Sequence, residues 1–327
     1  MNNSSHDKQE TSHELTVVIP FFNEGENIAS LAENLNSVLS KLNLTYEVIC
    51  VDDGSTDSTN DELKKASDKY LNFRLIRLRR NFGQTNALQA GFDLSNGEII
   101  ITLDGDGQND PKDIPMLLEK LNEGYDIVSG WRKNRKDPFL TKKVPSRFAN
   151  SLIGIVTGVK LHDYGCTLKA YRREILEDIN LYGEQHRYIP ALAKMYGAKI
   201  AEIEVTHHPR KHGSSSYGLG RIPRVFFDLI MLKFLLSYST KPMQVFGLIG
   251  ALTFFLGLII SVYLSILKFM GEPLAQRPLL LLGVLLIFIG IQFISMGILG
   301  ELVIRTYHES TSRKTYAVTK VDSNQNH

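Results

Sequence analysis

Short apolar runs alternate with longer amphipathic stretches along residues 15–130 of the chain. The apolar runs cover residues 15–20, 46–51, 74–78, 98–103 and 125–130, and the helix-like stretches cover about 25–41, 57–70 and 84–94. Short apolar strands joined by helices form βαβ units, in which a mostly parallel sheet is covered on both faces. The pattern therefore predicts a Rossmann-like α/β domain that begins near Leu15.

Acidic and amide side chains follow three of the predicted strands. Residues 20–24 (PFFNE) follow the first strand, 52–57 (DDGSTD) the second and 104–107 (DGDG) the fourth. Because ligands of open α/β sheets bind beyond the carboxyl ends of the strands, we expect these three clusters to converge on one rim and to form a binding site.

The third cluster predicts a metal site. Neither a Walker lysine loop nor a G-x-G-x-x-G run follows the first strand, so the usual phosphate cradles are missing. Carboxylates near a phosphate imply a bridging cation, and Asp104 and Asp106 would place two oxygen ligands on one side of a tight turn. The pair favours Mg²⁺ or Mn²⁺ shared with a diphosphate.

Two other interpretations of this cluster were weighed against the metal-diphosphate site. An EF-hand loop needs Gly at its sixth position and Glu at its twelfth, where this chain has Asn109 and Pro115. A solvated acidic turn is simpler, because Asp-Gly pairs are common in turns. That alternative leaves the convergence of three acidic clusters unexplained.

The last third of the chain contains two long uncharged apolar runs, at about 245–267 and 278–300. Each is long enough to cross a hydrocarbon core of roughly 30 Å as a helix. A buried soluble helical pair is the alternative, but only the segment from Lys268 to Arg277 joins the two runs. We therefore predict a transmembrane hairpin over residues 242–304.

Basic residues flank the outer ends of this hairpin more densely than its connecting segment, which has Lys268 and Arg277. The six outer residues are Lys233, Lys241, Arg305, Arg313, Lys314 and Lys320. By the positive-inside rule, both termini and the first domain lie in the cytoplasm, at the inner (plasma) membrane. Residues 1–14 lack an apolar segment, so they are interpreted as a disordered polar leader, and residues 305–327 as a cytosolic tail.

Residues 207–241 carry six Lys/Arg and one Asp beside the run IPRVFFDLIMLKFLLSY. Basic side chains next to an apolar helical face are typical of a helix that lies in the headgroup layer. We predict an interfacial amphipathic helix over 216–241. An ordinary core helix of the first domain is the alternative.

Composition excludes several classes of protein. With 327 residues, 43% of them hydrophobic, and 37 Lys+Arg against 35 Asp+Glu, the chain is neither disordered nor strongly basic. No nucleic-acid partner is therefore expected. Cys50 and Cys166 lie in separate apolar contexts, which excludes a disulfide framework or a cysteine-based zinc site.

Five motifs together resemble a known family: PFFNEGENI, VDDGSTDST, RRNFGQTNALQAGF, ITLDGDGQNDP and DYGCTLKAYRREI. They are similar to the inverting family 2 glycosyltransferases of the GT-A fold, and in particular to polyprenyl-phosphate glycosyltransferases of the bactoprenol glucosyltransferase type and to dolichyl-phosphate mannose synthases. The likeness extends over about Leu15–Arg305. It implies a GT-A catalytic domain over 15–215, followed by the interfacial helix and the hairpin.

The resemblance also implies roles for single residues. The nucleotide-sugar site would contain Pro20, Asn23, Glu24 and Asp53, while Asp104 and Asp106 would hold the metal and the diphosphate. Asp163 matches the position where many relatives keep a catalytic carboxylate. A phosphate monoester has a second pKa of about 6, so a lipid phosphate needs little help from a base, and whether Asp163 deprotonates or orients stays open.

Cations must screen the approach of an anionic acceptor to an anionic donor. The candidates for the acceptor phosphate are Arg132, Arg187, Arg210 and Lys211. Relatives usually have a lysine before the tyrosine of a G-x-S-K-Y stretch, whereas this chain has Ser216. That departure puts more weight on Arg210 and Lys211.

The expected reaction is transfer of a hexose, with glucose from UDP-glucose as the first expectation, to undecaprenyl phosphate with inversion. Mannose, galactose and aminoarabinose are the alternative sugars. A processive synthase would need a Q-x-x-R-W motif, which residues 185–188 (QHRY) do not provide. A catalytically inactive membrane scaffold or lipid carrier is the rival of another class. A homo-oligomer is also expected, because Gly283, Gly290, Gly297 and Gly300 would allow close helix contacts.

Overall fold

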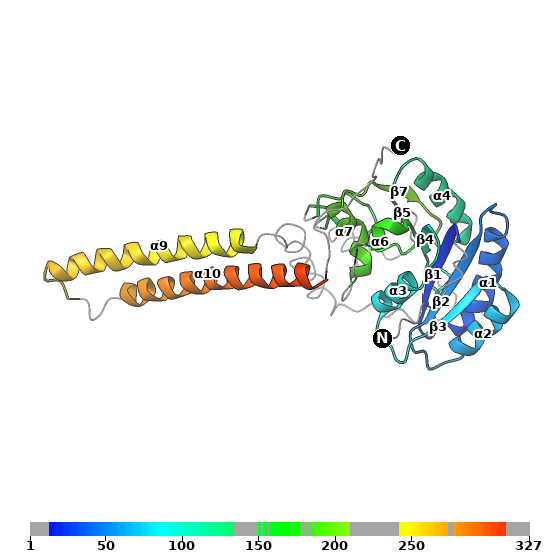
Figure 1. Cartoon of the computed structure of the whole chain (residues 1–327), viewed down its shortest axis with the longest axis horizontal. Helices are drawn as coiled ribbons and strands as arrows, with labels where there is room; N and C mark the ends of the chain where they lie inside the picture. The colour runs from blue at the N-terminus through cyan, green and yellow to red at the C-terminus, as the bar shows by residue number, and fades with distance from the viewer. Residues whose placement is uncertain are drawn as a thin grey trace, which may run out of the picture. The chain divides into compact units, whose positions relative to one another are not determined.

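The structure is a computed structural model that describes residues 13–133, 150–209 without 152, 156, 178, 180 and 182–184, 242–273, and 278–311. The chain divides into two compact units at Val225, and each is described by itself. The first unit is an α/β domain and the second contains a helical hairpin (Figure 1). The interfacial helix expected over 216–241 lies outside the described residues, as do residues 1–12 and 312–327.

The first unit is built on a seven-stranded sheet with the order β3-β2-β1-β4-β6-β5-β7. The strands are β1 Leu15–Phe21, β2 Tyr46–Asp52, β3 Phe73–Arg77, β4 Ile99–Thr102, β5 Ile127–Trp131, β6 Lys169–Arg172 and β7 Ile200–Glu204. Only β6 runs antiparallel to its neighbours, β4 and β5, and the other pairs are parallel. The predicted mostly parallel sheet is confirmed.

Helices cover both faces of the sheet. They are α1 Gly25–Leu39, α2 Thr59–Lys69, α3 Gln84–Asp93, α4 Ile114–Asn122, α6 Arg173–Glu177 and α7 Ile189–Met195, with 3₁₀ turns η1 Pro111–Asp113 and η3 Gln185–Tyr188. Val17 and Ile19 of β1 belong to the core that α1, α2 and α4 complete. Val18 points to the opposite face, where a Cβ on Gly91 would lie 2.2 Å from its Cγ1. Gly91 therefore lets α3 approach β1 closely.

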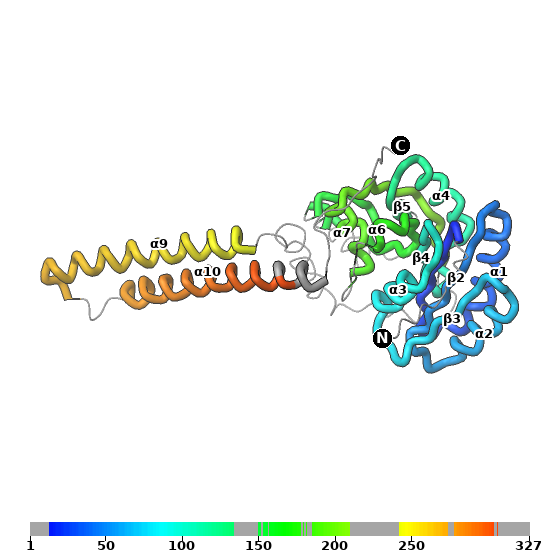
Figure 2. The backbone as a smooth tube through the Cα atoms, viewed as in Figure 1, coloured from blue at the N-terminus to red at the C-terminus, as the bar shows by residue number. Residues whose placement is uncertain are grey.

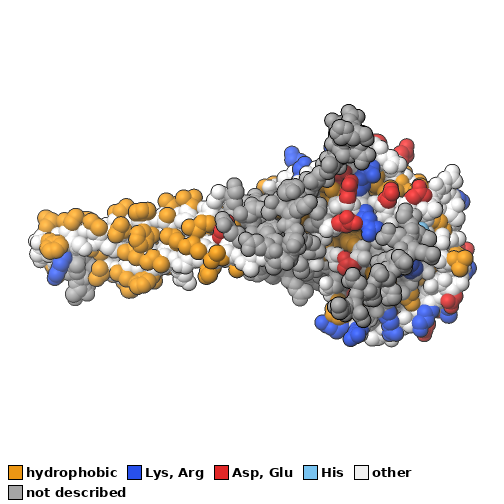
Figure 3. Space-filling model, viewed as in Figure 1, with side chains coloured by type: hydrophobic (Ala, Val, Ile, Leu, Met, Phe, Trp, Pro, Cys, Tyr) orange, Lys and Arg blue, Asp and Glu red, His pale blue; other side chains and the backbone are white. Residues whose placement is uncertain are grey.

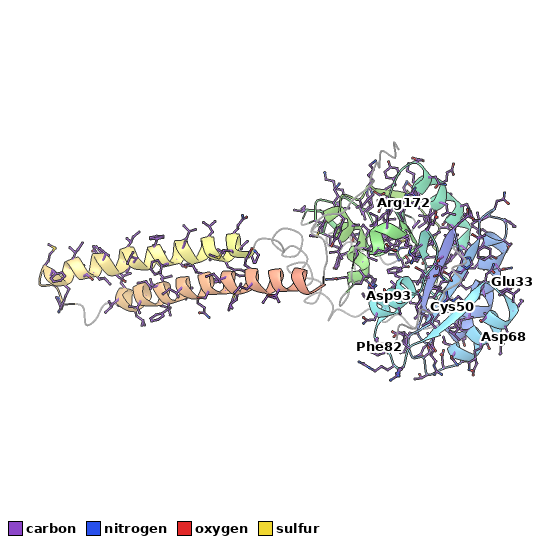
Figure 4. All side chains as sticks on the ribbon, in the orientation of Figure 1. Glu33, Cys50, Asp68, Phe82, Asp93 and Arg172 are labelled. Carbon is purple, nitrogen blue, oxygen red and sulfur yellow. The ribbon has the colours of Figure 1, made fainter. Side chains whose placement is uncertain are left out.

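Apolar side chains of the strands and of the inner helix faces form the core, and the outer helix faces are polar. This arrangement follows from side-chain periods of 2 in strands and 3.6 in helices. Cys50 lies on β2 inside the domain, whereas Glu33 and Asp68 lie on the exposed surfaces of α1 and α2 (Figure 4). Cys50 and Cys166 are both buried free thiols. Burial raises the pKa of Cys50 to about 12 and that of Cys166 to about 11, so both remain protonated core residues, as expected.

The second unit contains two long helices, α9 Pro242–Phe269 and α10 Pro278–Thr311. They lie side by side and run in opposite directions (Figure 2). Both are long and apolar enough to cross a membrane, with mean hydropathies of 2.5 over Pro242–Phe269 and 2.6 over Pro278–Val303. Helix α10 continues past the apolar run because residues after Gly300, such as Glu301 and Arg305, also favour a helix.

Glycines bring α9 and α10 into backbone contact. A Cβ on Gly250 would lie 2.7 Å from the carbonyl oxygen of Gly290, and one on Gly257 would lie 2.7 Å from that of Gly283. A Cβ on Gly297 would lie 3.0 Å from Met243 Sδ. The glycine row that the sequence suggested for contacts between chains is therefore used inside the hairpin, while apolar side chains cover the hairpin surface (Figure 3).

Candidate active site

The three polar clusters of the sequence meet at one edge of the sheet. Strands β2, β1 and β4 are adjacent and parallel, with Phe21 opposite Asp52 and Val18 opposite Thr102. The segments that follow these strands therefore leave the sheet at the same rim. This placement confirms the expectation that residues 20–24, 52–57 and 104–107 converge.

Asn23 and Glu24 join the turn after β1 to the turn after β2. Asn23 has a left-handed backbone with φ 56°, and its N–H donates to Ser55 Oγ at 3.0 Å while its Oδ1 accepts from the Thr56 N–H at 2.9 Å. The Glu24 N–H donates to Thr59 Oγ1 at 2.9 Å, and its carboxylate accepts from the Asn27 amide at 2.7 Å. These bonds hold the two loops in one arrangement, beside Pro20 at the end of β1.

Asp53 is buried and fixes the loop before α3. Its two carboxylate oxygens accept the N–H groups of Phe82 at 2.7 Å and Gly83 at 2.9 Å. Burial raises the pKa of Asp53, and these two backbone bonds partly offset the rise. The next residue, Gly54, has φ +69°, and a Cβ there would lie 2.4 Å from the Arg80 backbone. Only glycine fits this turn.

Asp104 and Asp106 lie on a tight turn after β4. Asp104 Oδ1 accepts from Gln84 Nε2 at 2.7 Å, and Asp106 Oδ1 accepts from the Gln108 N–H at 3.1 Å. Burial and the neighbouring Asp106 charge raise the pKa of Asp104 to about 6, while Thr167, Arg132 and Arg187 oppose the rise. A side chain on Gly105 would overlap the Phe21 ring at 2.4 Å, so the spacer between the two carboxylates must be glycine.

The chemistry of this pair fits a divalent cation. The charge of Asp106 contributes to the raised pKa of Asp104, and paired carboxylates are the hard oxygen ligands that Mg²⁺ or Mn²⁺ prefers. The described residues contain no group of three or more His, Cys, Asp or Glu that could hold a metal ion by themselves. Further ligands would have to come from water or from a bound phosphate.

Asp163 and Arg132 form a buried pair next to these carboxylates. Arg132 Nε donates to Asp163 Oδ2 at 2.7 Å and Nη2 donates to Oδ1 at 3.0 Å, with the Arg132 and Asp163 side chains 11% and 5% exposed. Hydrogen bonds and charge from Asp163 outweigh burial and raise the pKa of Arg132. Both oxygens of Asp163 are thus already bonded to a guanidinium.

Glu202 of β7 supports this pair from the side. Its carboxylate accepts the backbone N–H groups of His162 and Asp163, each within 3.0 Å, and pairs with His162 Nδ1 at 2.7 Å. The His162 ring stacks on Trp131 at a centroid distance of 4.2 Å. The turn that carries Asp163 is therefore anchored to β5 and β7.

Lys169 is a site residue that the sequence interpretation missed. It lies on β6, is 2% exposed, and its Nζ donates to the Tyr164 carbonyl at 3.3 Å. Burial lowers its pKa to about 8, and the charges of Cys166 and Asp163 oppose this fall while Arg132 and Arg187 reinforce it. No local pattern marks it, because β6, the strand that Lys169 begins, becomes a strand through its pairing with β4 and β5.

Arg187 of η3 lies near Asp104 and Lys169, because its charge lowers the pKa of both side chains. Its neighbour His186 is buried and its Nδ1 lies 2.7 Å from Thr85 Oγ1 of α3. This bond connects η3 to the helix whose first residue, Gln84, contacts Asp104. Of the predicted acceptor-phosphate residues, Arg132 and Arg187 are therefore placed at the site.

Residues 206–208 are bonded to the loop that follows Asp106. The His208 N–H donates to the Gln108 carbonyl at 2.8 Å, and His208 Nε2 lies 3.0 Å from Asp110 Oδ2. The Thr206 N–H donates to Asp113 Oδ2 at 2.6 Å. We call these contacts the 206–208 clamp. Arg210 and Lys211, which follow it in the chain, lie outside the described residues, as does Ser216.

Comparison with known proteins shows which family the chain resembles. The family model described as "Glycosyl transferase family 2" matches residues 16–180. A dodecaprenyl-phosphate galacturonate synthase of Rhizobium johnstonii is 43% identical over 96% of this chain and 94% of its own length. An undecaprenyl-phosphate 4-deoxy-4-formamido-L-arabinose transferase of Enterobacter is 37% identical over 97% of this chain and 96% of its own.

Solved structures share the fold of the first unit. Glucosyl-3-phosphoglycerate synthase from Mycobacterium tuberculosis, in complex with Mn²⁺, UDP and phosphoglyceric acid, has a TM-score of 0.54 and 18% identity over 69% of this chain and 78% of that chain. The same enzyme with Mn²⁺ and UDP-glucose gives a TM-score of 0.52. At this level of identity the likeness shows a GT-A-like fold, which confirms the fold that the motifs implied.

Proposed function

The chain belongs to glycosyl transferase family 2, and from this premise we propose that it transfers a sugar from a nucleotide donor to polyprenyl phosphate. The observation that carries the proposal is the 43% identity to a polyprenyl-phosphate transferase along nearly all of both chains. A catalytic domain joined to a membrane hairpin suits a lipid acceptor, and the likeness extends over both the α/β domain and the hairpin.

The donor occupies the rim formed by residues 20–24, Asp53, Asp104 and Asp106. The bonds of Asn23 to the β2–α2 turn and of Asp53 to the loop before α3 fix these loops before a nucleotide arrives, which lowers the cost of binding. When bound, Mg²⁺ or Mn²⁺ on Asp104 and Asp106 would neutralise charge on the leaving diphosphate.

The acceptor phosphate attacks the anomeric carbon of the donor sugar. A new bond forms between this carbon and a phosphate oxygen, the bond to the diphosphate oxygen breaks, and the nucleoside diphosphate leaves with the electron pair. Attack from the face opposite the leaving group inverts the configuration. Because a phosphate monoester is largely dianionic at neutral pH, no proton has to be removed.

This chemistry makes Asp163 a positioning residue for Arg132 and not a base. Both carboxylate oxygens accept hydrogen bonds from the guanidinium of Arg132, and these two bonds fix the orientation of the guanidinium. The guanidinium has five N–H donors, so Arg132 can still donate to a phosphate. Arg187, together with the predicted Arg210 and Lys211, supplies the remaining screening of the acceptor.

Galacturonate is the sugar that the relatives favour first. The galacturonate synthase is 43% identical to this chain, whereas the formamidoarabinose transferases are 37–39% identical. These names support the expected alternative of a modified sugar better than the first expectation of glucose. A uronate adds one negative charge to the donor, and the cluster of Arg132, Arg187 and Lys169 is a suitable cationic environment for it.

The second unit supports attachment of the chain to a membrane. The two apolar helices suit a transmembrane hairpin, and the basic residues at their outer flanks favour a cytoplasmic catalytic domain with both termini on the same side. The acceptor keeps its tail in the bilayer, so its phosphate meets the donor near the headgroup layer. The predicted helix over 216–241 would provide that interfacial contact.

A donor panel tests the sugar assignment. Purified full-length chain is supplied with undecaprenyl phosphate, Mn²⁺ and one of UDP-galacturonate, UDP-4-deoxy-4-formamido-arabinose or UDP-glucose. We expect kcat/KM to be highest for UDP-galacturonate, and at least about tenfold higher than for UDP-glucose, which is about 1.4 kcal/mol. Equal or greater turnover of UDP-glucose would refute the assignment. Asp106→Asn in parallel shows whether turnover depends on the proposed cation site.

A further inference from the structure

Helix α10 carries an amide side chain deep within its apolar part. At the helical rise of 1.5 Å per residue, Gln292 lies about 21 Å from Pro278 and about 16 Å from Val303, the two ends of the apolar span. In a hairpin that crosses a bilayer of roughly 30 Å, this position is near the hydrocarbon midplane. The inference below rests on the proposed membrane insertion.

The Gln292 side chain is exposed on the surface of the hairpin and makes no hydrogen bond within the described residues. Hydroxyl groups in the same helices behave differently. Ser261 and Ser295 donate to carbonyls of their own helix at 2.8 Å and 2.9 Å. The other amide of the described hairpin, Gln244, lies in the first turn of α9, where it can reach the headgroup layer.

Gln292 lies on the face of α10 that points away from α9. The glycines that contact α9, Gly283, Gly290 and Gly297, lie on the other side of the helix. Exposed side chains with alternating spacings of four and three residues form the outward row: Leu281, Leu285, Phe288, Gln292, Ser295, Leu299 and Leu302. Leu281 is 74% exposed, Phe288 67% and Leu299 62%. We call this row the α10 outer seam.

Helix α9 has an outer row with the same spacing, which gives an internal comparison. Its members are Leu248, Leu252, Phe255, Ile259, Val262, Ile266 and Phe269. The spacing alone therefore follows from the way two helices pack, and both rows could face lipid. Only the α10 outer seam contains an amide, Gln292, whose hydrogen-bonding groups lipid cannot bind. The outer row of α9 is apolar and needs no polar partner.

We propose that the α10 outer seam is an interface between two copies of this chain, with the Gln292 amides hydrogen-bonded to each other. An amide without a partner in hydrocarbon is costly, and acyl or isoprenoid chains offer neither donor nor acceptor. An amide has both, so two identical amides satisfy each other across a two-fold axis. A single polar position in an apolar seam also fixes the register of the two helices.

Cysteine cross-linking in native membranes tests this surface directly. Leu285→Cys and Ser295→Cys lie on the α10 outer seam, and Phe255→Cys and Leu248→Cys are their controls on the outer row of α9. The contacts of Gly257 with Gly283 and of Gly250 with Gly290 put Phe255 level with Leu285 and Leu248 within one helical turn of Ser295. The native Cys50 and Cys166 are buried. We expect dimers to form at least about fivefold faster for the α10 pair, and equal rates would overturn the proposal.

The glutamine itself is tested by Gln292→Leu in the Leu285→Cys chain. Gln244→Leu is the matched control, because it makes the same chemical change near a helix end. We expect Gln292→Leu to raise the dimer dissociation constant in lipid about tenfold and Gln244→Leu to leave it within about twofold. Unchanged cross-linking in Gln292→Leu would refute the role of the amide. Sugar transfer is measured on the same samples, so loss of the dimer and failure of the proposed reaction are distinguished.

Discussion

At the scale of single residues, Asp163 and Arg132 depend on each other. Removing the carboxylate would leave the Arg132 guanidinium, of which 11% of the side chain is exposed, without its anion. We expect Asp163→Ala to lower the free energy of unfolding by about 3 kcal/mol and to reduce transfer strongly. Urea unfolding followed by the fluorescence of Trp131, the one tryptophan of the chain, measures the first effect.

The double variant separates charge from packing. Asp163→Ala combined with Arg132→Met removes both charges, so stability should recover by at least about 1 kcal/mol relative to Asp163→Ala. Transfer should not recover, because the proposed contact to the acceptor phosphate is missing. A double variant as unstable as the single one would show that the carboxylate acts through something other than Arg132.

Lys169 should make stability depend on alkaline pH. Its pKa is lowered to about 8 in the folded chain, against about 10.4 in an unfolded one, so the unfolded state binds more protons between these values. Stability contributed by Lys169 is therefore fully present above about pH 10.4 and is lost as pH falls through 8. Relative to Lys169→Met, the wild type should gain up to about 3 kcal/mol between pH 8 and pH 10.4.

Unfolding in urea at several pH values measures this difference, with Lys199→Met on the domain surface as the control for general effects of alkali. A flat difference between the wild type and Lys169→Met would mean that Lys169 is not titrating in this range.

The acidic residues of the site could be found from the sequence, whereas their supporting residues could not. Asp53, Asp104 and Asp106 stand directly after apolar strands, so the pattern alone locates them. Lys169 and Glu202 act through contacts made across β5, β6 and β7. These contacts join residues far apart in the chain, and no local spacing encodes them.

At the scale of elements, the 206–208 clamp connects the metal-site loop to the segment that leads to Arg210 and Lys211. Asp113 holds the Thr206 N–H at 2.6 Å. We expect Asp113→Ala to raise the KM for the lipid acceptor about tenfold while the donor Kd changes less than twofold, because the bond to Thr206 is lost while Asp106 keeps its bond to the Gln108 N–H. Steady-state kinetics and isothermal titration with the donor measure the two quantities.

Asp126→Ala is the matched control. Asp126 binds the Lys199 N–H at 2.7 Å, which is the same kind of bond next to β5 and β7 but at the opposite ends of these strands from the rim. It should lower stability without changing the KM for the acceptor. Equal rises of this KM in both variants would point to general loosening of the domain.

The glycines at which α9 and α10 meet should tolerate no side chain. A Cβ on Gly290 would lie 2.6 Å from the Phe254 backbone nitrogen, whereas one on Gly247 would meet only the flexible end of Met243 at 3.1 Å. We expect Gly290→Ala to lower the melting temperature of the chain in mild detergent by several degrees and Gly247→Ala to leave it nearly unchanged. Equal melting temperatures would contradict the close approach of α9 and α10.

The apolar pattern predicted the first five strands and three of the helices to within about two residues at most ends, because β1, β2, β4 and β5 are mostly buried and each of the three helices buries one face. It did not predict β6 or β7. Strand β6 has the sequence KAYR, with a cation at each end, and β7 alternates Ile and Glu in IAEIE. Their pairing in the sheet, and not their own composition, makes them strands.

At the scale of the whole molecule, the sequence located both units but not their internal contacts. Apolar length alone predicted the two helices, and the motifs predicted the α/β domain. The glycine row was assigned to contacts between chains, and the structure shows it between α9 and α10. The spacing of the glycines identifies a helix face suited to close packing, but it does not say which helix packs against that face.

Mass spectrometry of the lipid product tests whether polyprenyl phosphate accepts the sugar. The full-length chain is incubated with UDP-galacturonate, Mn²⁺ and a short synthetic polyprenyl phosphate, with Asp106→Asn as the inactive control. We expect the lipid to gain the mass of one sugar residue, and NMR of the same product to show a phosphodiester of inverted anomeric configuration. Release of free sugar from the donor, with the lipid phosphate unchanged, would contradict it.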